Sequence, residues 1–529
     1  MIVPLTPLSF LRRAVKLYAK KTAVVCGEAR FTYAEFNERV QRLSHCLDAL
    51  GIQGGDVVAF LSRNCHRLLE AYYGVIQTGA VLLPLNCRLA GSDLIYVLNH
   101  SEAKLLFLAP EFLPVIASIR QSLRPDLKCI PLRNVPSRSW LDSNTYEQYL
   151  RQSSSLPFHV QLSDEHGVTE LFYTSGTTDR PKGVMLTHRN LYLHALNVIW
   201  ALQNRDTDVQ LHTIPLFHAN GWGATHTITA VGGTHILFPH FYPRTVFQVI
   251  GKERVTTFNL IPTMGTMLLQ APVTVKEDFS SLRLIHLGGS SVPKEMVKQL
   301  QQRFRCEVTC GYGLTEASPV MTVAHPKSHL DEDEKSFYER SAMTGLELPG
   351  CEVRVVDDNG TDVCKDGKSV GEIVLRSNTV MKGYWKQPEE TADAIRDGWL
   401  YTGDLATVDP ENYLLIVDRK KDMIIRGGEN IASIEIERIL YSHPSVLECA
   451  VIAVPDSKWG ECPVGFVVSR PGYTCNSEIL TQHCRAHLAS FKVPSRIEVV
   501  DSLPKGGTGK IQKRVLREPY WAGKDKQVS

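Results

Sequence analysis

Blocks of apolar and polar residues alternate along most of the chain before Cys351, and their spacing switches between that of helices and that of strands. In TYAEFNERVQRLSHCLDALG, Phe36, Val40, Leu43 and Leu47 lie three or four positions apart. This spacing places them on one face of a helix, which we expect to end at the glycine of the block. The next block, DVVAFLS, is short and mostly apolar and predicts a buried strand.

The same alternation returns further along the chain. RLLEAYYGVIQTGAVLLPLN predicts a helix, a glycine turn and a strand, and LRLIHLGGSSVPKEMVKQLQQRF predicts a strand, a Gly-Ser turn and a helix with Pro293 in its first turn. Strands that alternate with helices are typical of parallel sheets covered by helices. Ligands of such sheets bind at the loops after the carboxyl ends of the strands, and the loops 174–183, 288–291 and 311–316 are in such places.

The pattern changes from about Cys351. CEVRVVDDNG and VGEIVLRS read as strands of a smaller β-rich unit with an Asp-Asn-Gly turn, and the residues after Asp422 mix short helices and strands. The predicted fold class is therefore α/β. We expect a large N-terminal domain of helix-flanked, mainly parallel sheets with a small β-rich subdomain, followed by a small, mobile α+β C-terminal domain.

Composition narrows the class of protein. The chain has 529 residues, 43% of them hydrophobic and 22% charged, which is typical of a folded protein with more than one domain. The net charge of +2 gives no argument for binding nucleic acid. The 13 cysteines are scattered without a C-x-x-C pair, which favours reduced thiols over a disulfide framework and suggests no zinc site.

The ends of the sequence bear on its location. The N-terminal residues are apolar but broken by two prolines and soon basic, so they do not read as a signal peptide. No stretch approaches the roughly 18 apolar residues that span a bilayer, and the final residues, KDKQVS, are not the S-K-L peroxisomal signal. We expect a cytoplasmic protein without a transmembrane segment; peripheral contact with a membrane and a homodimer both stay open.

The stretch YTSGTTDRPKG, Tyr173–Gly183, carries the first chemical signal. It combines four Ser or Thr residues, two glycines and Lys182, as a phosphate-binding loop would, but it lacks the P-loop pattern. Four further motifs follow in order: GYGLTE (Gly311–Glu316), YTGD (Tyr401–Asp404), DRKKDMIIRGGENI (Asp418–Ile431) and PKGGTGKIQKR (Pro504–Arg514). A single glycine-rich loop is a weak signal, whereas this ordered set is specific.

With these motifs the sequence resembles the superfamily of adenylate-forming enzymes that includes acyl-CoA synthetases, luciferases and the adenylation domains of peptide synthetases. The resemblance covers almost the whole chain and is strongest to fatty acyl-CoA ligases. It implies an N-terminal AMP-binding domain over 1–417, a hinge at 418–421 and a mobile C-terminal domain over 422–529. The implied reaction joins a small-molecule carboxylic acid to ATP, releasing pyrophosphate, and then transfers the acyl group from AMP to coenzyme A.

The resemblance also assigns roles to single residues. It implies that Lys510 is the adenylation lysine and that Glu316, Thr315 and His218 act beside the reacting groups. It implies Mg²⁺ as a cofactor held by Glu316 with Thr174, since Mg²⁺ favours oxygen ligands and few carboxylates. The implied ATP- and AMP-binding residues are Thr174, Ser175, Gly176, Thr177, Thr178, Lys182, Gly288, Gly289, Ser290, Gly311, Tyr312, Gly313, Asp404 and Arg419.

The implied C-terminal domain has two further functions. Lys421 matches the hinge position, and Gly427, Gly428 and Glu429 match the face that forms a thiol tunnel for coenzyme A. The chain departs from the family pattern at two positions. Asp179 stands where the phosphate loop usually has glycine, which predicts a local adjustment and weaker binding of ATP. Ser433 stands where proline is common, and from this change we expect little.

PLFHANGWG carries the information on the acid. By resemblance, His218 lies beside the bound carboxylate and Trp222 at the mouth of the acyl pocket, with Gly313, Pro319 and Val320 along its wall. No aspartate stands here to meet an amino group, and the lining is uncharged, which favours a plain carboxylic acid with a hydrocarbon tail. The hypothesis is a medium- to long-chain fatty acid, although the sequence does not fix a chain length.

Alternative functions stay open. One is a CoA ligase for an aryl, short or branched-chain acid, and another is an enzyme that loads a carrier protein instead of free coenzyme A. A third is a degenerate acyl-nucleotide binding protein, for which Asp179 is the only indication. For single residues the alternatives are structural: Lys510 as a solvated surface lysine, and His218 and Trp222 as core packing.

Overall fold

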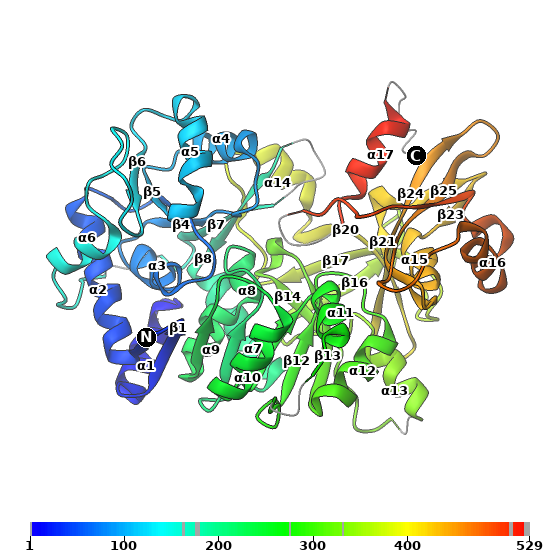
Figure 1. The fold of residues 1–529 in the computed structure, drawn as a ribbon, viewed down its shortest axis with the longest axis horizontal. Coiled ribbons are helices and arrows are strands. Elements are labelled where there is room, and N and C mark those ends of the chain that lie inside the picture. Colours follow the sequence, from blue (N-terminus) through cyan, green and yellow to red (C-terminus); the bar gives the residue numbers. More distant parts are fainter. Residues whose placement is uncertain are drawn as a thin grey trace. The chain divides into compact units, whose positions relative to one another are not determined.

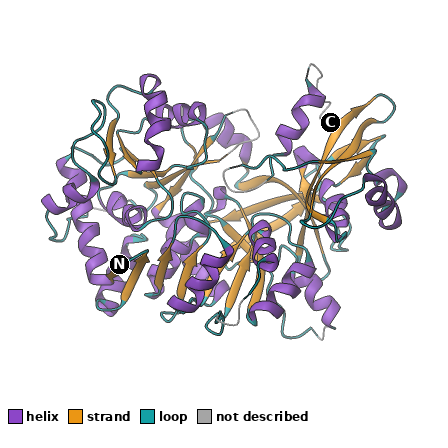
Figure 2. Ribbon diagram, in the orientation of Figure 1, coloured by secondary structure: helices purple, strands orange, loops and turns teal. Residues whose placement is uncertain are grey.

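The computed structural model describes residues 3–160, 164–174, 180–273, 277–330, 333–506 and 511–522. The chain forms two compact units, the first made of residues 1–342, 347–352 and 376–398 and the second of residues 343–346, 353–375 and 399–529. Helices and strands alternate through the first unit, as Figures 1 and 2 show. The predicted α/β class is confirmed, with the β-rich and α+β parts toward the C-terminus. The residues of the predicted hinge, 418–421, lie inside the second unit.

One sheet of the first unit has the order β18-β8-β7-β4-β3-β5-β6, and β3, β4, β5, β6 and β7 pair in parallel. The inner strand β3 has every side chain buried, which explains its continuously apolar sequence, VVAFL. The strands are β3 (Val57–Leu61), β4 (Val81–Pro84), β5 (Leu105–Leu108), β6 (Lys128–Pro131), β7 (Val168–Thr174), β8 (Lys182–Thr187) and β18 (Gly383–Tyr384).

The other large sheet has the order β14-β13-β12-β11-β9-β10-β1-β2, and its strands from β13 to β1 are parallel. Its strands are β1 (Thr22–Cys26), β2 (Ala29–Thr32), β9 (Val209–His212), β10 (Thr234–Leu237), β11 (Thr257–Leu260), β12 (Leu284–Leu287), β13 (Glu307–Gly313) and β14 (Val320–Val323). The two-residue strand β15 (Leu346–Glu347) continues this sheet beyond β14, and β19 (Ile395–Arg396) is another strand of two residues.

The register of this sheet brings the predicted binding loops together. Leu260 pairs with Leu287, and Leu287 pairs with Cys310, so β11, β12 and β13 end at one edge. The loops 288–291 and 311–316 therefore leave the sheet side by side, as the alternation of strands and helices predicts.

Helices cover the sheets of the first unit (Figure 1). Their starts follow local sequence signals: Thr32 and Glu35 form a capping box before α2, and Pro243 occupies the first turn of α10. Pro293 caps α12 and does not lie in its first turn, a small correction to the sequence prediction. The helices are α1 (Leu8–Tyr18), α2 (Tyr33–Ala49), α3 (His66–Gln77), α4 (Gly91–His100), α5 (Leu113–Ile119), α6 (Tyr146–Gln152), α7 (His188–Leu202), α8 (Ala219–Trp222), α9 (Ala224–Val231), α10 (Pro243–Glu253), α11 (Pro262–Gln270), α12 (Lys294–Phe304), α13 (Glu334–Ser341) and α14 (Pro388–Ala394), with 3-10 turns η1 (Pro110–Phe112), η2 (Arg120–Ser122) and η3 (Thr315–Ala317).

The second unit contains antiparallel strands and a small α+β part. The β20 strand pairs with both β17 and β21, and further along the chain β24 and β25 form a long hairpin to which β26 adds in parallel. The elements are β16 (Cys351–Val356), β17 (Gly371–Ser377), β20 (Trp399–Val408), β21 (Leu414–Arg419), η4 (Lys420–Asp422), β22 (Ile424–Arg426), β23 (Glu429–Ile431), α15 (Ser433–Ser442), β24 (Val446–Asp456), β25 (Gly460–Ser469), α16 (Ser477–His487), η5 (Ser490–Lys492), β26 (Arg496–Val499) and α17 (Lys513–Trp521).

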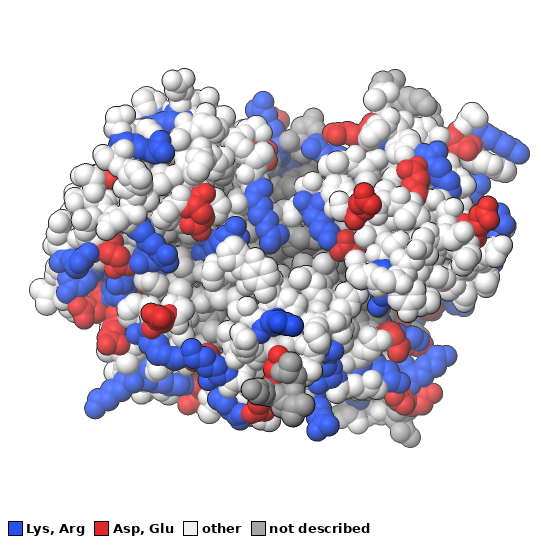
Figure 3. All heavy atoms as spheres, in the orientation of Figure 1, with Lys and Arg blue, Asp and Glu red and all other residues white. Residues whose placement is uncertain are grey.

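The surface charges and the cysteine thiols agree with what the sequence predicts. Positive and negative side chains are interspersed over the face shown in Figure 3, in keeping with 58 basic and 56 acidic residues. All 13 cysteines are free thiols. Among the described residues, no helix combines the length and the apolar character needed to cross a membrane.

Candidate active site

The predicted phosphate loop connects two paired strands. Thr174 ends β7, Lys182 begins β8, and the two residues are partners in the antiparallel ladder. The loop between them is thus held at both ends by one hairpin. Its predicted ligands Ser175, Gly176, Thr177 and Thr178, and the unusual Asp179, lie outside the described residues.

Lys182 connects the phosphate loop to the GYGLTE loop through two residues that the motif analysis missed. Its ammonium pairs with Glu390 of α14 and lies 5.0 Å from the centre of the Tyr384 ring. The Tyr384 hydroxyl donates a hydrogen bond of 3.1 Å to Glu316 Oε1. Burial and the charge of Glu316 raise the pKa of Tyr384, so the phenol remains a donor. In the sequence, the only signal was an aromatic and acidic cluster, GYWKQPEET.

Three glycines of the predicted nucleotide loops permit very close packing. A Cβ at Gly313 would lie 1.6 Å from the carbonyl oxygen of Pro319, and one at Gly311 would lie 2.7 Å from the carbonyl oxygen of Thr322. A Cβ at Gly288 would lie 3.3 Å from the Trp222 indole. The structure thus brings the loops after β12 and β13 against a residue of the predicted acid site, through backbone that no side chain could replace.

The remaining residues of this edge are arranged around the glycines. Thr315 is buried at the start of η3, and Pro319 and Val320 are buried just before and at the start of β14. The Val320 N–H donates to His194 Nε2 at 3.0 Å. Gly289 has a left-handed backbone, and Ser290 is exposed beside it. Tyr312, at the end of β13, is half-buried.

The backbone from Ala219 to Gly223 is left-handed at five successive residues, with φ angles of 39°, 46°, 59°, 60° and 75°. Figure 1 labels this segment α8. Three of the five residues have side chains, and each of those adopts this conformation at a cost of about 1–2 kcal/mol. His218 precedes the turn and is half-buried, whereas Trp222 lies within it and is 7% exposed. Backbone strain of this kind persists only where surrounding contacts impose it.

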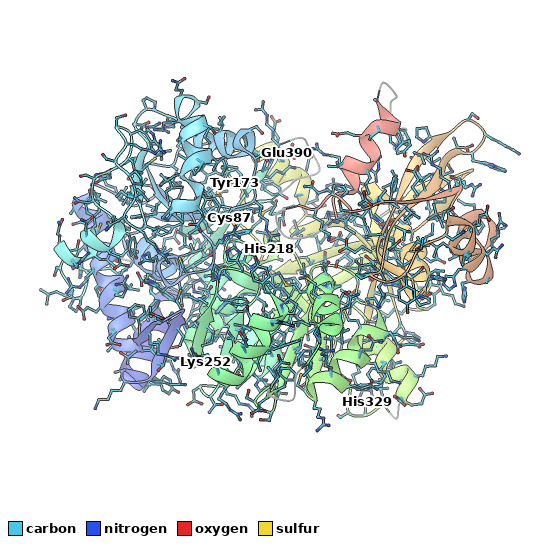
Figure 4. All side chains as sticks on the ribbon, viewed as in Figure 1. Cys87, Tyr173, His218, Lys252, His329 and Glu390 are labelled. Atoms are coloured by element: carbon cyan, nitrogen blue, oxygen red, sulfur yellow. The ribbon has the colours of Figure 1, made fainter. Side chains whose placement is uncertain are left out.

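Several buried side chains impose the path of this segment. Asn64 donates from Nδ2 to the carbonyl oxygens of His212 and Ile214, at 3.0 and 3.1 Å, and its Oδ1 accepts from the Leu216 N–H at 2.8 Å. The Tyr72 hydroxyl donates to the Leu216 carbonyl oxygen at 2.6 Å. The loop before His218 is therefore fixed by Asn64, which lies between β3 and α3, and by Tyr72 of α3. In Figure 4, the charged Lys252 and the titratable His329 lie well away from His218.

In the second unit, two predicted nucleotide ligands meet. Asp404 of β20 and Arg419 of β21 are partners in the ladder, and Arg419 Nε lies 3.3 Å from Asp404 Oδ1. The neighbouring Gly403 has a φ of 70° and donates its N–H to Glu372 Oε1 at 3.0 Å. The YTGD motif thus places the Asp404 carboxylate, whose side chain is 13% exposed, beside a guanidinium.

The predicted thiol-tunnel residues form a tight hairpin turn. Gly427 and Gly428 have φ angles of 60° and 87° and connect β22 to β23, which begins with Glu429. Two successive positive φ angles are the requirement of a type I′ turn, which explains the glycine pair. Gly427 also packs against Trp459, since a Cβ would lie 2.8 Å from its ring. The predicted hinge residue Lys421 lies in η4, where burial and the nearby Arg419 lower its pKa.

Ser433 has a larger role than its sequence suggested. Its N–H and its hydroxyl both donate to Asp418 Oδ2, at 2.5 and 2.6 Å, and the hydroxyl oxygen accepts from Lys513 Nζ at 2.6 Å. Lys513 also pairs with Glu437 at 2.8 Å. Burial alone would lower the pKa of Lys513, but these carboxylates raise it. Serine therefore ties the start of α17 to the end of β21, which proline could not do.

The predicted adenylation lysine, Lys510, lies outside the described residues. Its chain neighbours are described: Lys505 pairs with Glu448 at 2.5 Å, and the Gln512 N–H donates to the Pro504 carbonyl oxygen at 2.8 Å. Pro504, Lys505 and Gln512 are thus held within the second unit.

Comparison with known proteins agrees with this geometry. Residues 11–385 match the family model described as AMP-binding enzyme, and residues 435–510 match the AMP-binding enzyme C-terminal domain. The chain is 36% identical over 535 residues to a peroxisomal butyrate–CoA ligase of Arabidopsis thaliana, covering 98% of this chain and 93% of that protein. It is 37% identical over 521 residues to a long-chain-fatty-acid–CoA ligase of Thermus thermophilus, covering 97% and 95%.

A solved structure gives the same result. The anthranilate CoA ligase in complex with anthranoyl-AMP superposes with a TM-score of 0.90 at 28% identity, covering 98% of both chains. The chain belongs to the AMP-binding enzyme family. Within that family it is an acid–thiol ligase, an AMP-forming acyl-CoA synthetase that works through an acyl-adenylate.

The packing at Gly313 gives a first prediction. Replacing Gly313 with alanine places a methyl group inside the Pro319 carbonyl, so we expect a loss of more than about 3 kcal/mol of unfolding free energy, the upper range for overpacking. Thermal denaturation measures the change. Gly54→Ala is the control, because a Cβ there meets nothing nearer than the Gly79 carbonyl oxygen at 3.8 Å. Equal melting temperatures for both variants would contradict the packing argument.

The contacts of Ser433 give a second prediction. Proline is favourable at the first position of a helix, so Ser433→Pro leaves α15 intact but removes both donors to Asp418. We expect a loss of roughly 3–6 kcal/mol, about 1.5–3 for each hydrogen bond to a charged group, and a smaller loss for Ser433→Ala. The matched control is Ser477→Ala at the exposed start of α16. Chemical denaturation measures all three, and a neutral Ser433→Pro would show that these bonds contribute nothing.

Proposed function

We propose that the substrate of this ligase is a medium- to long-chain fatty acid. The observation that supports this choice is the character of the predicted acid site, where Trp222, Pro319 and Val320 are buried and apolar. A buried charge near the acid tail would need a partner, and these residues have none to offer, so a hydrocarbon tail is the chemistry they suit.

The proposed mechanism begins with a problem of charge. A carboxylate must approach a triphosphate, and negative charge develops on the phosphoryl oxygens, so catalysis depends on cations and fixed donors. We assign Lys182 and the hydroxyl residues after Thr174 to the β- and γ-phosphates, which leave as pyrophosphate. Lys510 would neutralise the oxygens at the α-phosphate, and Asp404 would accept hydrogen bonds from the ribose hydroxyls, with Arg419 beside it.

The acid and thiol would be held by other residues. We assign His218 to the side of the bound carboxylate and Thr315 to the α-phosphate, with the backbone of Gly288, Gly289 and Ser290 and the ring of Tyr312 around adenine. The turn at Gly427 and Gly428, with Glu429, would guide the thiol of coenzyme A after a rotation about Lys421. Each of these roles stays a proposal.

Glu316 and Thr174 offer a carboxylate and a hydroxyl, which are oxygen donors suited to Mg²⁺. Within the described ranges, no group of three or more His, Cys, Asp or Glu residues could hold a metal by itself. This agrees with an ion that binds through few protein ligands and the phosphates of the substrate. When bound, Mg²⁺ would supply charge neutralisation at the phosphates. Glu316 is oriented for this role by the hydrogen bond from Tyr384.

A second candidate is an aryl or short-chain acid. The packing of Trp222 favours this candidate. The Trp222 and His286 rings pack edge to face with their centres 6.2 Å apart, and the indole also contacts the Gly288 loop. A bulky ring fixed in this place limits the room for a long tail. The cytoplasm remains the proposed location.

A panel of acids tests the choice of substrate. The purified enzyme is assayed for AMP release with octanoate, palmitate, butyrate, benzoate and cinnamate, with free coenzyme A as the acceptor. We expect the aliphatic acids of eight or more carbons to give the highest kcat/KM, since each methylene bound adds about 1–3 kcal/mol. A tenfold preference for benzoate or cinnamate, about 1.4 kcal/mol, would establish the second candidate instead.

The role of Lys510 has its own test. We expect Lys510→Ala to slow adenylation at least about a hundredfold, the scale for losing one charge-stabilising group. Exchange of radiolabelled pyrophosphate into ATP isolates this half-reaction. The control is Lys368→Ala, which removes an exposed lysine of the same unit. Unchanged exchange in Lys510→Ala would refute the assignment.

A further inference from the structure

Glu170 is a fully buried carboxylate in β7, between the buried residues Thr169 and Leu171. Its burial raises its pKa, which reflects the cost of removing the charge from water. Such a group persists in a protein interior only where hydrogen bonds offset that cost. Neither the phosphate contacts nor the acid contacts proposed above use this residue.

Both carboxylate oxygens of Glu170 have directional partners. Oε2 accepts a hydrogen bond of 2.6 Å from Asn220 Nδ2, and Oε1 lies 2.8 Å from His226 Nε2. Asn220 and His226 are themselves buried, at 0% and 2% exposure. Within the described part of the chain, Asn220 Oδ1 has no hydrogen-bond partner, so Glu170 alone sets the orientation of this amide.

Asn220 stands in the left-handed turn that carries the predicted acid-site residues. His218 comes two residues before it and Trp222 two residues after it. Other bonds to the turn are longer: the Asn220 carbonyl oxygen accepts from Thr225 Oγ1 at 3.3 Å, and the Gly221 carbonyl oxygen accepts from Asn259 Nδ2 at 3.3 Å. The bond to Glu170 is the shortest of these three, and it is the one to a charged group, which makes it the stronger anchor.

The other end of the connection is the phosphate loop. Glu170 and Thr174 lie on the same face of β7, since side chains alternate along a strand and these two are four residues apart. A strand paired on both sides is a stiff element; β7 pairs with β4 and β8. The short, buried hydrogen bond between Asn220 and Glu170 therefore resists a displacement of the turn relative to the phosphate loop.

We propose that Glu170 is a positioning residue for acyl-adenylate formation: through Asn220 and His226 it holds the turn 219–223 so that His218 and Trp222 meet the acid in fixed register with the strand that ends at Thr174. The inference rests on the proposed assignment of His218 and Trp222 to the acid site. It applies to any acid, so it does not depend on the chain length of the substrate.

Exchanging the donor and the acceptor of the Asn220–Glu170 hydrogen bond tests the proposal. Asn220→Asp sets two carboxylates against each other, and we expect kcat/KM for the acid to fall about a hundredfold, the scale for a reacting group displaced by about 1 Å. The KM for ATP should be unchanged. In the double variant Glu170→Gln/Asn220→Asp, the new amide donates to the new carboxylate while its oxygen still accepts from His226. We expect this pair to recover most of the lost activity with the acid.

The matched control is Glu70→Gln, which alters another fully buried carboxylate of the same unit. Glu70 is bonded to His66, Arg39 and Tyr146, none of which belongs to the turn. We expect this control to lower the melting temperature while kcat/KM for the acid stays at the wild-type value. This control distinguishes the effect of displacing the turn from the effect of removing a buried charge.

Binding measurements extend the test to inactive variants. Calorimetry compares AMP with an acyl-sulfamate analogue of the adenylate, and Asn220→Asp should weaken only the analogue. The proposal is overturned if Asn220→Asp keeps full activity with the acid, if the double variant is no better than the single one, or if AMP binding falls equally. If Asn220→Asp does not fold, Glu170→Gln decides, and an unchanged kcat/KM for the acid overturns the proposal. Failure of the wild-type enzyme with every acid would instead count against the proposed function.

Discussion

The carbonyl oxygen of Pro319 occupies the space that a side chain at position 313 would need, and the arrangement of the nucleotide edge depends on this approach. It allows β13 and β14 to pair with a bulge at their ends and to turn within a few residues. The turn delivers Thr315 and Glu316 to the same edge as the loop after β12. A side chain larger than hydrogen at Gly313 would separate the two strands, so backbone contact defines this part of the site.

Buried carboxylates organise the loops on both units in a similar way. In the first unit, Glu170 reaches from a strand to an unusual turn, and in the second, Asp418 reaches from the end of β21 to the start of α15. Glu170 accepts hydrogen bonds from residues 50 and 56 positions away in the sequence, and Asp418 accepts from Ser433, 15 positions away. Charge-assisted bonds suit this task because they fix direction as well as distance.

The repeating pattern of helices and strands could be predicted from sequence because it depends on local periodicity, and the glycine-rich motifs identified the edge where the loops gather. The contacts of Glu390 and Glu170 could not be predicted in this way. Glu390 meets Lys182 across more than two hundred residues, and no spacing rule connects them. The charge of Glu170 inside TELFYT was a visible irregularity, but its partners depend on the left-handed turn. Ser433 appeared to be a neutral departure because its three bonds are made at long range.

In the proposed phosphate site, the pair between Lys182 and Glu390 would make anion binding selective by charge. The carboxylate is an internal competitor that never diffuses away, so an incoming anion gains affinity only if it attracts the ammonium more strongly than Glu390 does. A magnesium triphosphate can meet that condition through many oxygens, whereas chloride or inorganic phosphate has fewer to offer. The same competition would hasten departure of pyrophosphate from the proposed site, since Glu390 remains as a counter-ion for the lysine. In the proposed site, one exchangeable ion pair would then make binding tight enough to select the nucleotide and loose enough to release its product.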